Sequence, residues 1–164
     1  MGSSPAQERH NGFRDALQER TDLIFRPVEG DWRYDVAAKR LKEIDFLQPI
    51  DFVYAHNDMM AIAAREHFLA IDPVRGKELH IIGMDAVANA GLEAVADGRI
   101  NVSFLYPTGG EQVIRTAMQL LRGEKVDKYI PLLSGLVDKS AAQTLLLQSE
   151  RLSNYQQRIE TQRS

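Results

Sequence analysis

The stretch that decides the fold class is Asp51-Phe-Val-Tyr-Ala-His-Asn-Asp58, where an apolar strand stops at a polar triplet and a helical pattern begins at once. The same arrangement recurs at Leu79-His-Ile-Ile-Gly-Met-Asp85, where a strand of the buried type ends on a carboxylate. It recurs again at Ile100-Asn-Val-Ser-Phe-Leu-Tyr106. Strands that alternate with helices in this way are typical of an α/β fold, so we predict an open, mostly parallel sheet flanked by helices.

Three polar or aromatic side chains end these strands, namely Asn57, Asp85 and Tyr106. The carboxyl ends of parallel strands share one edge of the sheet, and this edge is where open α/β sheets bind ligands. We therefore expect these three side chains to lie together at a binding edge.

Apolar spacing and cap residues predict the remaining elements. The expected helices cover 5–19, a stretch after Trp32 with Val36, Ala37, Leu41 and Ile44 on one face, 59–69, a segment ending at Gly98, and 108–122. The expected strands cover 22–27, 51–56, 79–84, 100–105 and 130–137, and 71–76 is expected to be a loop.

The last segment differs in character from the rest. From about Ser140 onward, apolar residues recur every seven positions at Leu145, Leu152 and Ile159, and most other positions are polar. A thin apolar stripe on a polar helix is typical of a stalk or a coiled-coil lead-in. We therefore divide the chain into a lobe over 1–139 and a C-terminal helix or linker over 140–164, which offers a contact for a homodimer.

Composition and length indicate one domain. The chain has 164 residues, of which 44% are hydrophobic, and it can build one core. Its net charge of -3 comes without a basic stripe, so nucleic acid is not an expected partner. It has no cysteine, which excludes disulfides and thiolate metal sites, and no apolar run approaches the ~20 residues of a membrane helix. The opening, Met-Gly-Ser-Ser-Pro, favours a chain cut from a longer protein.

A sugar site needs few side chains: carboxylates and amides that bond several hydroxyls, a guanidinium fork, and an aromatic face for the C–H side of the ring. This chain supplies such a set in Arg9, Trp32, Asn57, Asp85 and Tyr106. Each of them also has a structural role open to it, since Asn and Asp commonly cap helices and aromatic rings commonly pack in cores. Together they predict a ligand site.

Catalytic motifs find less support. The sequence lacks a cysteine nucleophile, a Gly-x-Ser-x-Gly elbow, a Gly-rich phosphate loop and a His-x-x-x-His pair, so we expect no catalytic residue, metal ion or cofactor. His56 offers a general base beside Asn57, but strand alternation aims the two side chains at opposite faces. An enzyme acting on a small polar substrate is therefore the weaker alternative.

Five short motifs follow one another along the chain: Ser4-Pro-Ala-Gln-Glu-Arg-His-Asn-Gly-Phe13, Tyr54-Ala-His-Asn-Asp58, Ile82-Gly-Met-Asp85, Asp97-Gly98 and Leu121-Arg-Gly-Glu-Lys125. The first three are similar to the signatures Ser-x-Ala-x-x-Arg-x-x-Gly-Phe, Ala-x-Asn-Asp and Val-Gly-Phe-Asp. In this order they resemble the C-terminal lobe of ribose-binding-protein-like periplasmic sugar receptors, a class shared with the effector domains of lactose-repressor-like regulators. The resemblance covers nearly the whole chain.

This resemblance implies one lobe of a periplasmic-binding-protein-like fold. It places Arg9, Asn57 and Asp85 at positions that hydrogen-bond sugar hydroxyls in the family. It places Trp32 where an aromatic ring stacks on the sugar, and Tyr106 at the crossing between lobes, where a polar side chain touches ligand.

Two residues depart from the family pattern. His56 stands where a small or amide residue is commoner, and Tyr106 is larger than the usual amide. The resemblance therefore does not identify the sugar. It also implies that helix 108–122 crosses between lobes and packs on an N-terminal lobe absent from this chain.

The ending Gly135-Leu-Val-Asp-Lys-Ser140 and the polar heptad tail resemble a narrower group, the sensor domains of hybrid two-component histidine kinases. This resemblance implies a periplasmic, non-catalytic, sugar-sensing domain of an inner-membrane protein, joined to the membrane by a helix outside this chain. A transporter's sugar-binding protein and the effector domain of a lactose-repressor-like regulator are the alternatives. The expected partners are a small-molecule sugar, the N-terminal lobe and a second copy of the chain.

Overall fold

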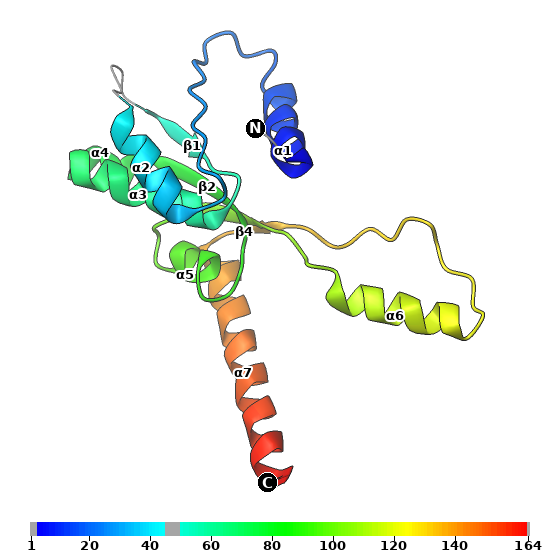
Figure 1. Cartoon of the computed structure of the whole chain (residues 1–164). Helices are drawn as coiled ribbons and strands as arrows, with labels where there is room; N and C mark the ends of the chain where they lie inside the picture. The colour runs from blue at the N-terminus through cyan, green and yellow to red at the C-terminus, as the bar shows by residue number, and fades with distance from the viewer. Residues whose placement is uncertain (1–2, 45–49, 164) are drawn as a thin grey trace.

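Four strands form one sheet in the order β1-β2-β3-β4. The computed structural model describes residues 3–44 and 50–163. The strands β1 (Phe52–Tyr54), β2 (His80–Asp85) and β3 (Val102–Leu105) run parallel, and β4 (Leu136–Val137) pairs antiparallel with β3. The open, mostly parallel α/β sheet predicted from the sequence is confirmed, and helices flank it (Figure 1).

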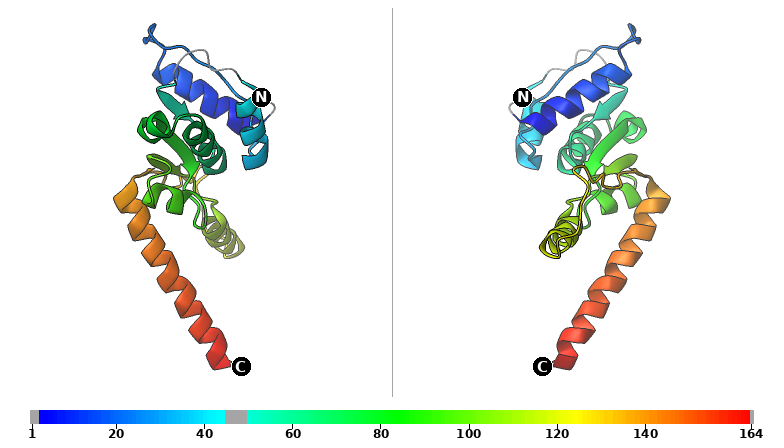
Figure 2. Two further views of the ribbon diagram at one scale, coloured as in Figure 1. Left: turned by 90° about the vertical axis from the view of Figure 1, so that its left-hand side faces the viewer. Right: turned by 90° about the vertical axis from the view of Figure 1, so that its right-hand side faces the viewer.

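The helices differ in how they meet this sheet. They are α1 (Ser4–Ala16), α2 (Tyr34–Glu43), α3 (Asp58–Ile71), α4 (Pro73–Glu78), α5 (Gly91–Ala96), α6 (Gly110–Leu121) and α7 (Lys139–Arg163). Helix α3 packs against α2, α4 and strand β2, whereas α5 packs against β2, β3 and α7. Figures 1 and 2 show α6 and α7 extending away from the sheet.

Small and branched apolar side chains form the core between α3, α5 and the sheet. Ile81 of β2, Val95 of α5 and Ile100 are almost completely buried. Ala61 and Ala94 are also fully buried, and their short side chains allow α3 and α5 to approach the strands closely. Burial of an isoleucine or valine side chain contributes about 1.5–3 kcal/mol. The core therefore fixes β2 and β3, whose carboxyl ends carry the candidate site.

Aromatic rings attach α1 to β1. Phe52 and Tyr54 project from one face of β1, because side chains alternate along a strand. Phe13 of α1 stacks on Tyr54 with 4.7 Å between ring centroids, and on Phe52 with 6.1 Å. Phe25 meets Phe13 edge-on at 5.8 Å. These contacts hold α1 beside the edge of the sheet.

The strand predicted over 22–27 is wrong. This segment is irregular backbone and takes no part in the sheet, since β1 pairs only with β2. A strand needs a neighbour that accepts its hydrogen bonds, and apolar alternation alone does not supply one. Phe25, an apolar residue of this segment, packs its ring against Phe13 of α1 instead of joining the sheet.

The loop predicted over 71–76 is also wrong, because α4 begins at Pro73. The side chain of Asp72 accepts hydrogen bonds from the backbone nitrogens of Val74, at 3.0 Å, and Arg75, at 3.1 Å. Proline suits the first helical position, where its missing N–H has no partner to lose. The strand predicted over 130–137 shrinks to the two residues of β4.

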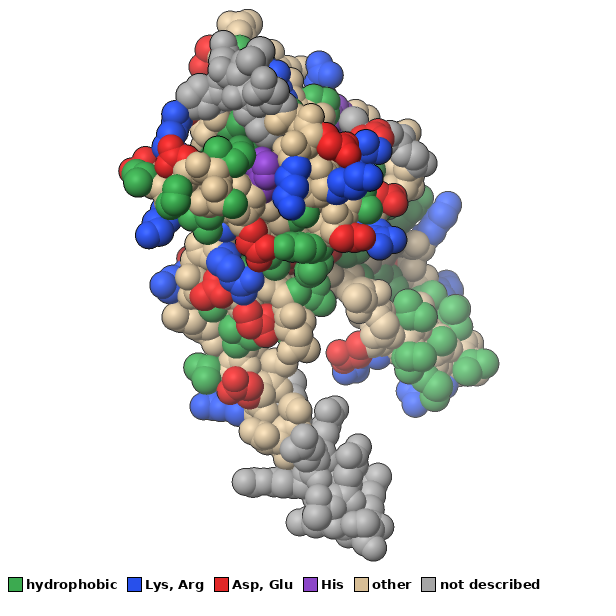
Figure 3. Space-filling model, turned by 60° about the vertical axis from the view of Figure 1, so that its left-hand side comes forward, with side chains coloured by type: hydrophobic (Ala, Val, Ile, Leu, Met, Phe, Trp, Pro, Cys, Tyr) green, Lys and Arg blue, Asp and Glu red, His purple; other side chains and the backbone are tan. Residues whose placement is uncertain are grey.

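Helix α6 carries an uncovered apolar face. None of its residues is buried, and the exposed fractions of Val113, Ile114 and Leu121 reach 65%, 66% and 82%. Figure 3 shows hydrophobic side chains gathered on this projecting helix. Tyr129 and Leu133, in the return segment to β4, are 80% and 86% exposed. The lobe's own core does not cover these side chains.

Helix α7 begins on the lobe and then leaves it. Ala142 is fully buried, and Ala141, Leu145 and Leu146 pack against the same core. The side chains of Leu152 and Ile159, which complete the predicted heptad stripe, lie outside the described residues. Within the part of the chain that the structure describes, no helix is both long and apolar enough to span a membrane.

A buried arginine ties the amino ends of β2 and β3 together. Arg65 of α3 is 3% exposed, and its guanidinium donates to the carbonyl oxygens of Gly76, Leu79 and Arg99. It also donates to Asn101 Oδ1, at 3.1 Å. Burial lowers the pKa of Arg65. The backbone carbonyls thus take the place of a carboxylate partner.

Replacement of Arg65 by methionine removes the four hydrogen bonds that its guanidinium donates. Bonds to a charged group are each worth about 1.5–3 kcal/mol, so we expect the free energy of unfolding to fall by about 3 kcal/mol or more. Urea denaturation measures this loss. Arg40→Met is the control, because Arg40 makes an exposed ion pair with Glu43, and it should cost less than about 1 kcal/mol. Equal losses in the two variants would contradict the assignment.

Candidate functional site

Arg9 of α1 lies at the centre of the candidate site. Its Nη2 atom is 3.5 Å from Asp85 Oδ1, at the carboxyl end of β2, and Nη1 donates to the carbonyl oxygen of His56. The guanidinium carbon lies 5.3 Å from the ring centroid of Trp32 and 5.0 Å from that of Tyr106. The side chain of Arg9 is only 12% exposed. One cation therefore joins a helix to the ends of three successive strands.

Asn57 joins this group through the backbone of Trp32. Its side-chain nitrogen donates to the carbonyl oxygen of Trp32 at 2.9 Å, and its side-chain oxygen accepts from the backbone nitrogen of Met60 at 2.9 Å. Asn57 is 8% exposed and is the N-cap of α3. The structure thus brings Arg9, Trp32, Asn57, Asp85 and Tyr106 together at one end of the sheet.

The backbone at two of these residues has an unfavourable conformation. Asp85 has a φ of 105° and the following Ala86 a φ of 50°, while Trp32 has a φ of 61°. Positive φ costs of order 1–3 kcal/mol at residues other than glycine, and such positions gather at functional sites. The surrounding contacts therefore hold Asp85 and Trp32 in positions that the free chain would avoid.

Charges in the site are partly desolvated. Burial raises the pKa of Asp85, and the positive charge of Arg9, with its hydrogen bond, opposes this rise. Burial also lowers the pKa of His56, with further contributions from the charges of Arg9 and His10. The His56 ring lies near Tyr54 and Trp32, with centroid distances of 5.4 Å and 6.1 Å. Arg9 and Asp85 therefore face each other in a partly dry site, with the His56 ring nearby.

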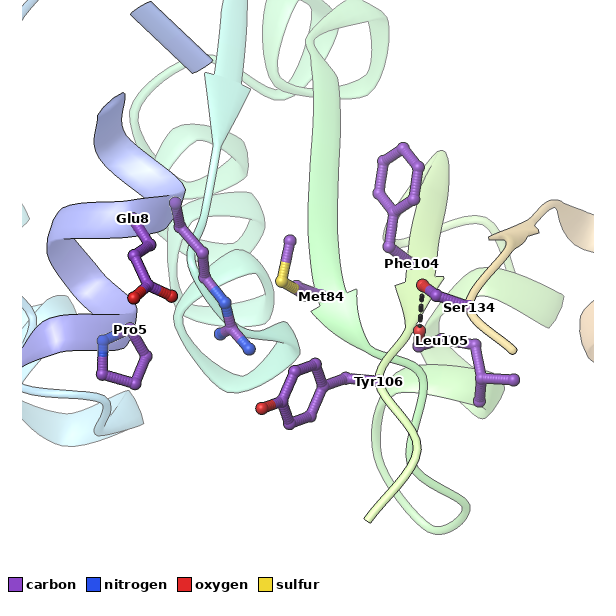
Figure 4. Close-up of a pocket in the computed structure, with 8 residues that line it drawn as sticks. Pro5, Glu8, Met84, Phe104, Leu105, Tyr106 and Ser134 are labelled. Atoms are coloured by element: carbon purple, nitrogen blue, oxygen red, sulfur yellow. Dashed lines mark hydrogen bonds between the residues drawn. The ribbon is translucent and has the colours of Figure 1, made fainter. Parts of the chain in front are cut away.

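A hollow of about 440 Å³ opens beside this group (Figure 4). It lies between α1, the ends of β2 and β3, and the segment before β4, and is lined by Pro5, Glu8, Arg9, Met84, Phe104, Leu105, Tyr106 and Ser134. Of the five predicted residues, Arg9 and Tyr106 line it, whereas Trp32, Asn57 and Asp85 do not. Its volume falls in the range of ~300–1,000 Å³ typical of small-molecule sites.

The arrangement suits neutral polar ligands. Arg9 donates and Asp85 accepts hydrogen bonds, and Trp32 and Tyr106 offer apolar ring faces. Among the described residues, no three His, Asp, Glu or Cys side chains are placed to hold a metal ion.

Asp58 is a further important residue, which the sequence analysis did not include among the candidate site residues. It follows Asn57, is 1% exposed, and turns toward the sheet. Its Oδ1 accepts from the Ser103 hydroxyl of β3 at 2.6 Å, and its Oδ2 accepts from the backbone nitrogen of Ala86 at 2.8 Å. Burial raises its pKa to about 6, against the opposing effect of these hydrogen bonds.

Two glycines make room for this carboxylate. A Cβ atom at Gly83 would overlap Oδ1 of Asp58, and a Cβ atom at Gly91 would overlap Oδ2. Gly83 is paired with Ser103 in the sheet, and Gly91 begins α5. We call this arrangement the Asp58 socket: the carboxylate, its donors Ser103 and Ala86, and the two glycines. An Asn-Asp pair after one strand, with glycines on the next strand and helix, is the sequence signal that would have indicated it.

The raised pKa of Asp58 makes the stability of the fold depend on pH. Its folded value of about 6 lies above the ordinary 3.8, so stabilisation by the protonated form is complete below pH 3.8 and is lost as the pH rises through 6. We expect Asp58→Asn to remove a contribution of about 1 kcal/mol per pH unit across this window. Urea denaturation of both proteins across that pH range measures the difference. Parallel pH profiles would contradict the assignment.

A family profile and several solved structures match this chain. The sequence profile described as "periplasmic binding protein domain" matches residues 1–125. The fructose-binding periplasmic domain of the hybrid two-component system BT1754 is 32% identical, with a TM-score of 0.82, and the match covers 98% of this chain and 54% of that chain. No curated protein sequence matches this chain.

Two solute-binding proteins of ABC transporters share the fold. One, from Mycobacterium smegmatis with bound glycerol, is 29% identical with a TM-score of 0.69, and the match covers 86% of this chain and 49% of that chain. The other, from Actinobacillus succinogenes 130z with bound D-allose, is 22% identical with a TM-score of 0.71, covering 84% and 49%. The chain thus spans about half the length of these structures. Its profile match, together with the 32% identity over nearly its whole length, shows that the chain belongs to the periplasmic binding protein domain family.

Proposed function

We propose that this chain is one lobe of a two-lobe periplasmic receptor that binds a small neutral sugar. The observation that carries the proposal is the position of Arg9, which lies between Asp85 and the rings of Trp32 and Tyr106. A guanidinium and a carboxylate together bond neighbouring hydroxyls, and ring faces cover the C–H side of a sugar. In this proposal Asn57 fixes the loop of Trp32 and offers its remaining hydrogen-bonding capacity to the ligand.

Similar proteins support the ligand class. The 32% identical relative is described as fructose-binding, and the two transporter proteins were solved with glycerol and D-allose. All three ligands are neutral polyhydroxylated molecules. The sugar of this chain is therefore expected among monosaccharides and related polyols, with D-fructose as the first to test.

Signal sensing is the role we favour. The 32% identical relative belongs to a hybrid two-component system, and α7 continues for 25 residues after β4. We propose that the whole protein is a histidine kinase of the inner membrane and that α7 leads toward its membrane helix. The second candidate is a transporter's binding protein, which the 29% identical relative favours. Sugar-dependent autophosphorylation of the full-length protein with ATP would establish the first role, and its absence would leave the second.

A second lobe is the proposed cover of α6. This helix extends away from the sheet, and its Val113, Ile114 and Leu121 side chains are exposed (Figure 1). The chain spans about half of its relatives, which leaves room for another lobe of similar size. In this arrangement α6 and the segment before β4 cross to the other lobe, and the sugar lies between the two.

Asp85→Ala in the two-lobe receptor is expected to weaken sugar binding by about 10- to 100-fold. The variant removes charge-assisted hydrogen bonds worth about 1.5–3 kcal/mol each from a partly dry site. Calorimetric titration with D-fructose, D-allose and glycerol measures it, and Trp32→Ala should also weaken binding. Asp72→Ala is the control, because Asp72 is a partly exposed carboxylate that caps α4, the helix before β2. Unchanged affinity in both site variants would disprove this site.

The isolated chain is expected to self-associate through α6. A contiguous apolar face of this kind is unusual on the surface of a monomer. Light scattering should show dimers or larger species, and Ile114→Glu should shift them toward monomer. Arg115→Ala is the matched control on the same helix, since Arg115 makes an exposed ion pair with Glu111. A clean monomer at high concentration would contradict the prediction.

A further inference from the structure

We infer that Asp58 is the positioning residue that holds Asp85 in its binding conformation, an inference that rests on the proposed sugar site. Asp58 is too deeply buried to touch a ligand, with 1% of its surface exposed. It acts through the backbone nitrogen of Ala86, which immediately follows Asp85 and donates to Asp58 Oδ2 at 2.8 Å.

The conformation at this point of the chain needs an external restraint. Asp85 and Ala86 both have positive φ, at 105° and 50°, and neither is glycine. Two successive residues of this kind are unfavourable in a free chain. The bond from the Ala86 N–H to a buried acceptor opposes relaxation of both residues, and so keeps the Asp85 side chain facing Arg9, 3.5 Å away.

The position of the acceptor is itself determined by three elements. Ser103 of β3 donates to Oδ1 of Asp58, while Gly83 of β2 and Gly91 of α5 leave space that no larger residue would leave. Displacement of any of these elements moves the carboxylate away from the Ala86 N–H. The socket therefore couples the shape of the sugar site to the packing of β2, β3 and α5.

The conservative variant separates positioning from general stability. The Oδ1 of asparagine can accept from the Ala86 N–H, and its Nδ2 can donate to the Ser103 hydroxyl. Asp58→Asn in the two-lobe receptor should therefore keep the affinity for D-fructose within about threefold. Asp58→Ala lacks the acceptor, and we expect a loss of about tenfold or more.

A second readout needs no ligand. In Asp58→Ala the Ala86 amide should exchange with solvent about tenfold faster or more, because its hydrogen bond is lost, and it should stay protected in Asp58→Asn. Leu79→Ala is the control for stability, since Leu79 lies in the core before β2. It should leave the affinity within about threefold and speed exchange at Ala86 no more than at other core amides. If wild-type receptor binds no sugar of the panel, the proposed function fails, and the exchange rates still decide on the role of Asp58.

A further variant applies if Asp58→Ala does not fold. Gly91→Ala keeps the carboxylate but places a methyl group against Oδ2, so it should weaken sugar affinity and Ala86 protection together, each by about threefold or more. A folded Asp58→Ala or Gly91→Ala protein with wild-type exchange at Ala86 would overturn the inference. Equal loss of affinity in Asp58→Asn and Asp58→Ala would also overturn it.

Discussion

The cost of burying the Asp58 carboxylate is the constraint on which the rest of the lobe depends. An ionised group in a dry interior is expensive unless donors surround it. Here the donors come from Ser103 of β3 and from the backbone that follows β2, while α5 begins against the same carboxylate. The Asp58 side chain therefore links α3, β2, β3 and α5 at one point.

Arg9 plays the corresponding role outside this core. Phe13 attaches α1 to β1 by ring stacking, and Arg9 adds polar contacts between α1 and the strand ends. Its guanidinium donates to the His56 carbonyl oxygen and to Asp85. Its neighbours are a carboxylate, a carbonyl and two ring faces, all of which stabilise a cation in a partly dry setting. The contacts that recognise a ligand in our proposal are thus the contacts that hold a helix in place, and binding and local order are expected to change together.

The sequence predicted those parts of the fold that depend only on the local pattern of residues within each segment. Regular alternation of strands and helices was sufficient to bring Asn57, Asp85 and Tyr106 to one end of a parallel sheet. It did not separate the roles of Asn57 and Asp58, because either residue can cap a helix and only the packed sheet shows which one turns inward. Segment 22–27 has the composition of a strand without a neighbour to pair with, and the burial of Arg65 has no local sequence signal.

The geometry of α7 gives the lobe a lever arm. The helix is fixed to the lobe over its first turns, where Ala142 is buried and the helix packs on α5, and it then continues to a total of 25 residues. At about 1.5 Å per residue, a tilt of roughly 5° at the lobe displaces the far end by about 3 Å. Helix α5 begins against the Asp58 carboxylate, beside the loop that follows Asp85, and it packs on α7. A small shift of α5 at the site therefore tilts α7, and the displacement grows along α7 toward its far end.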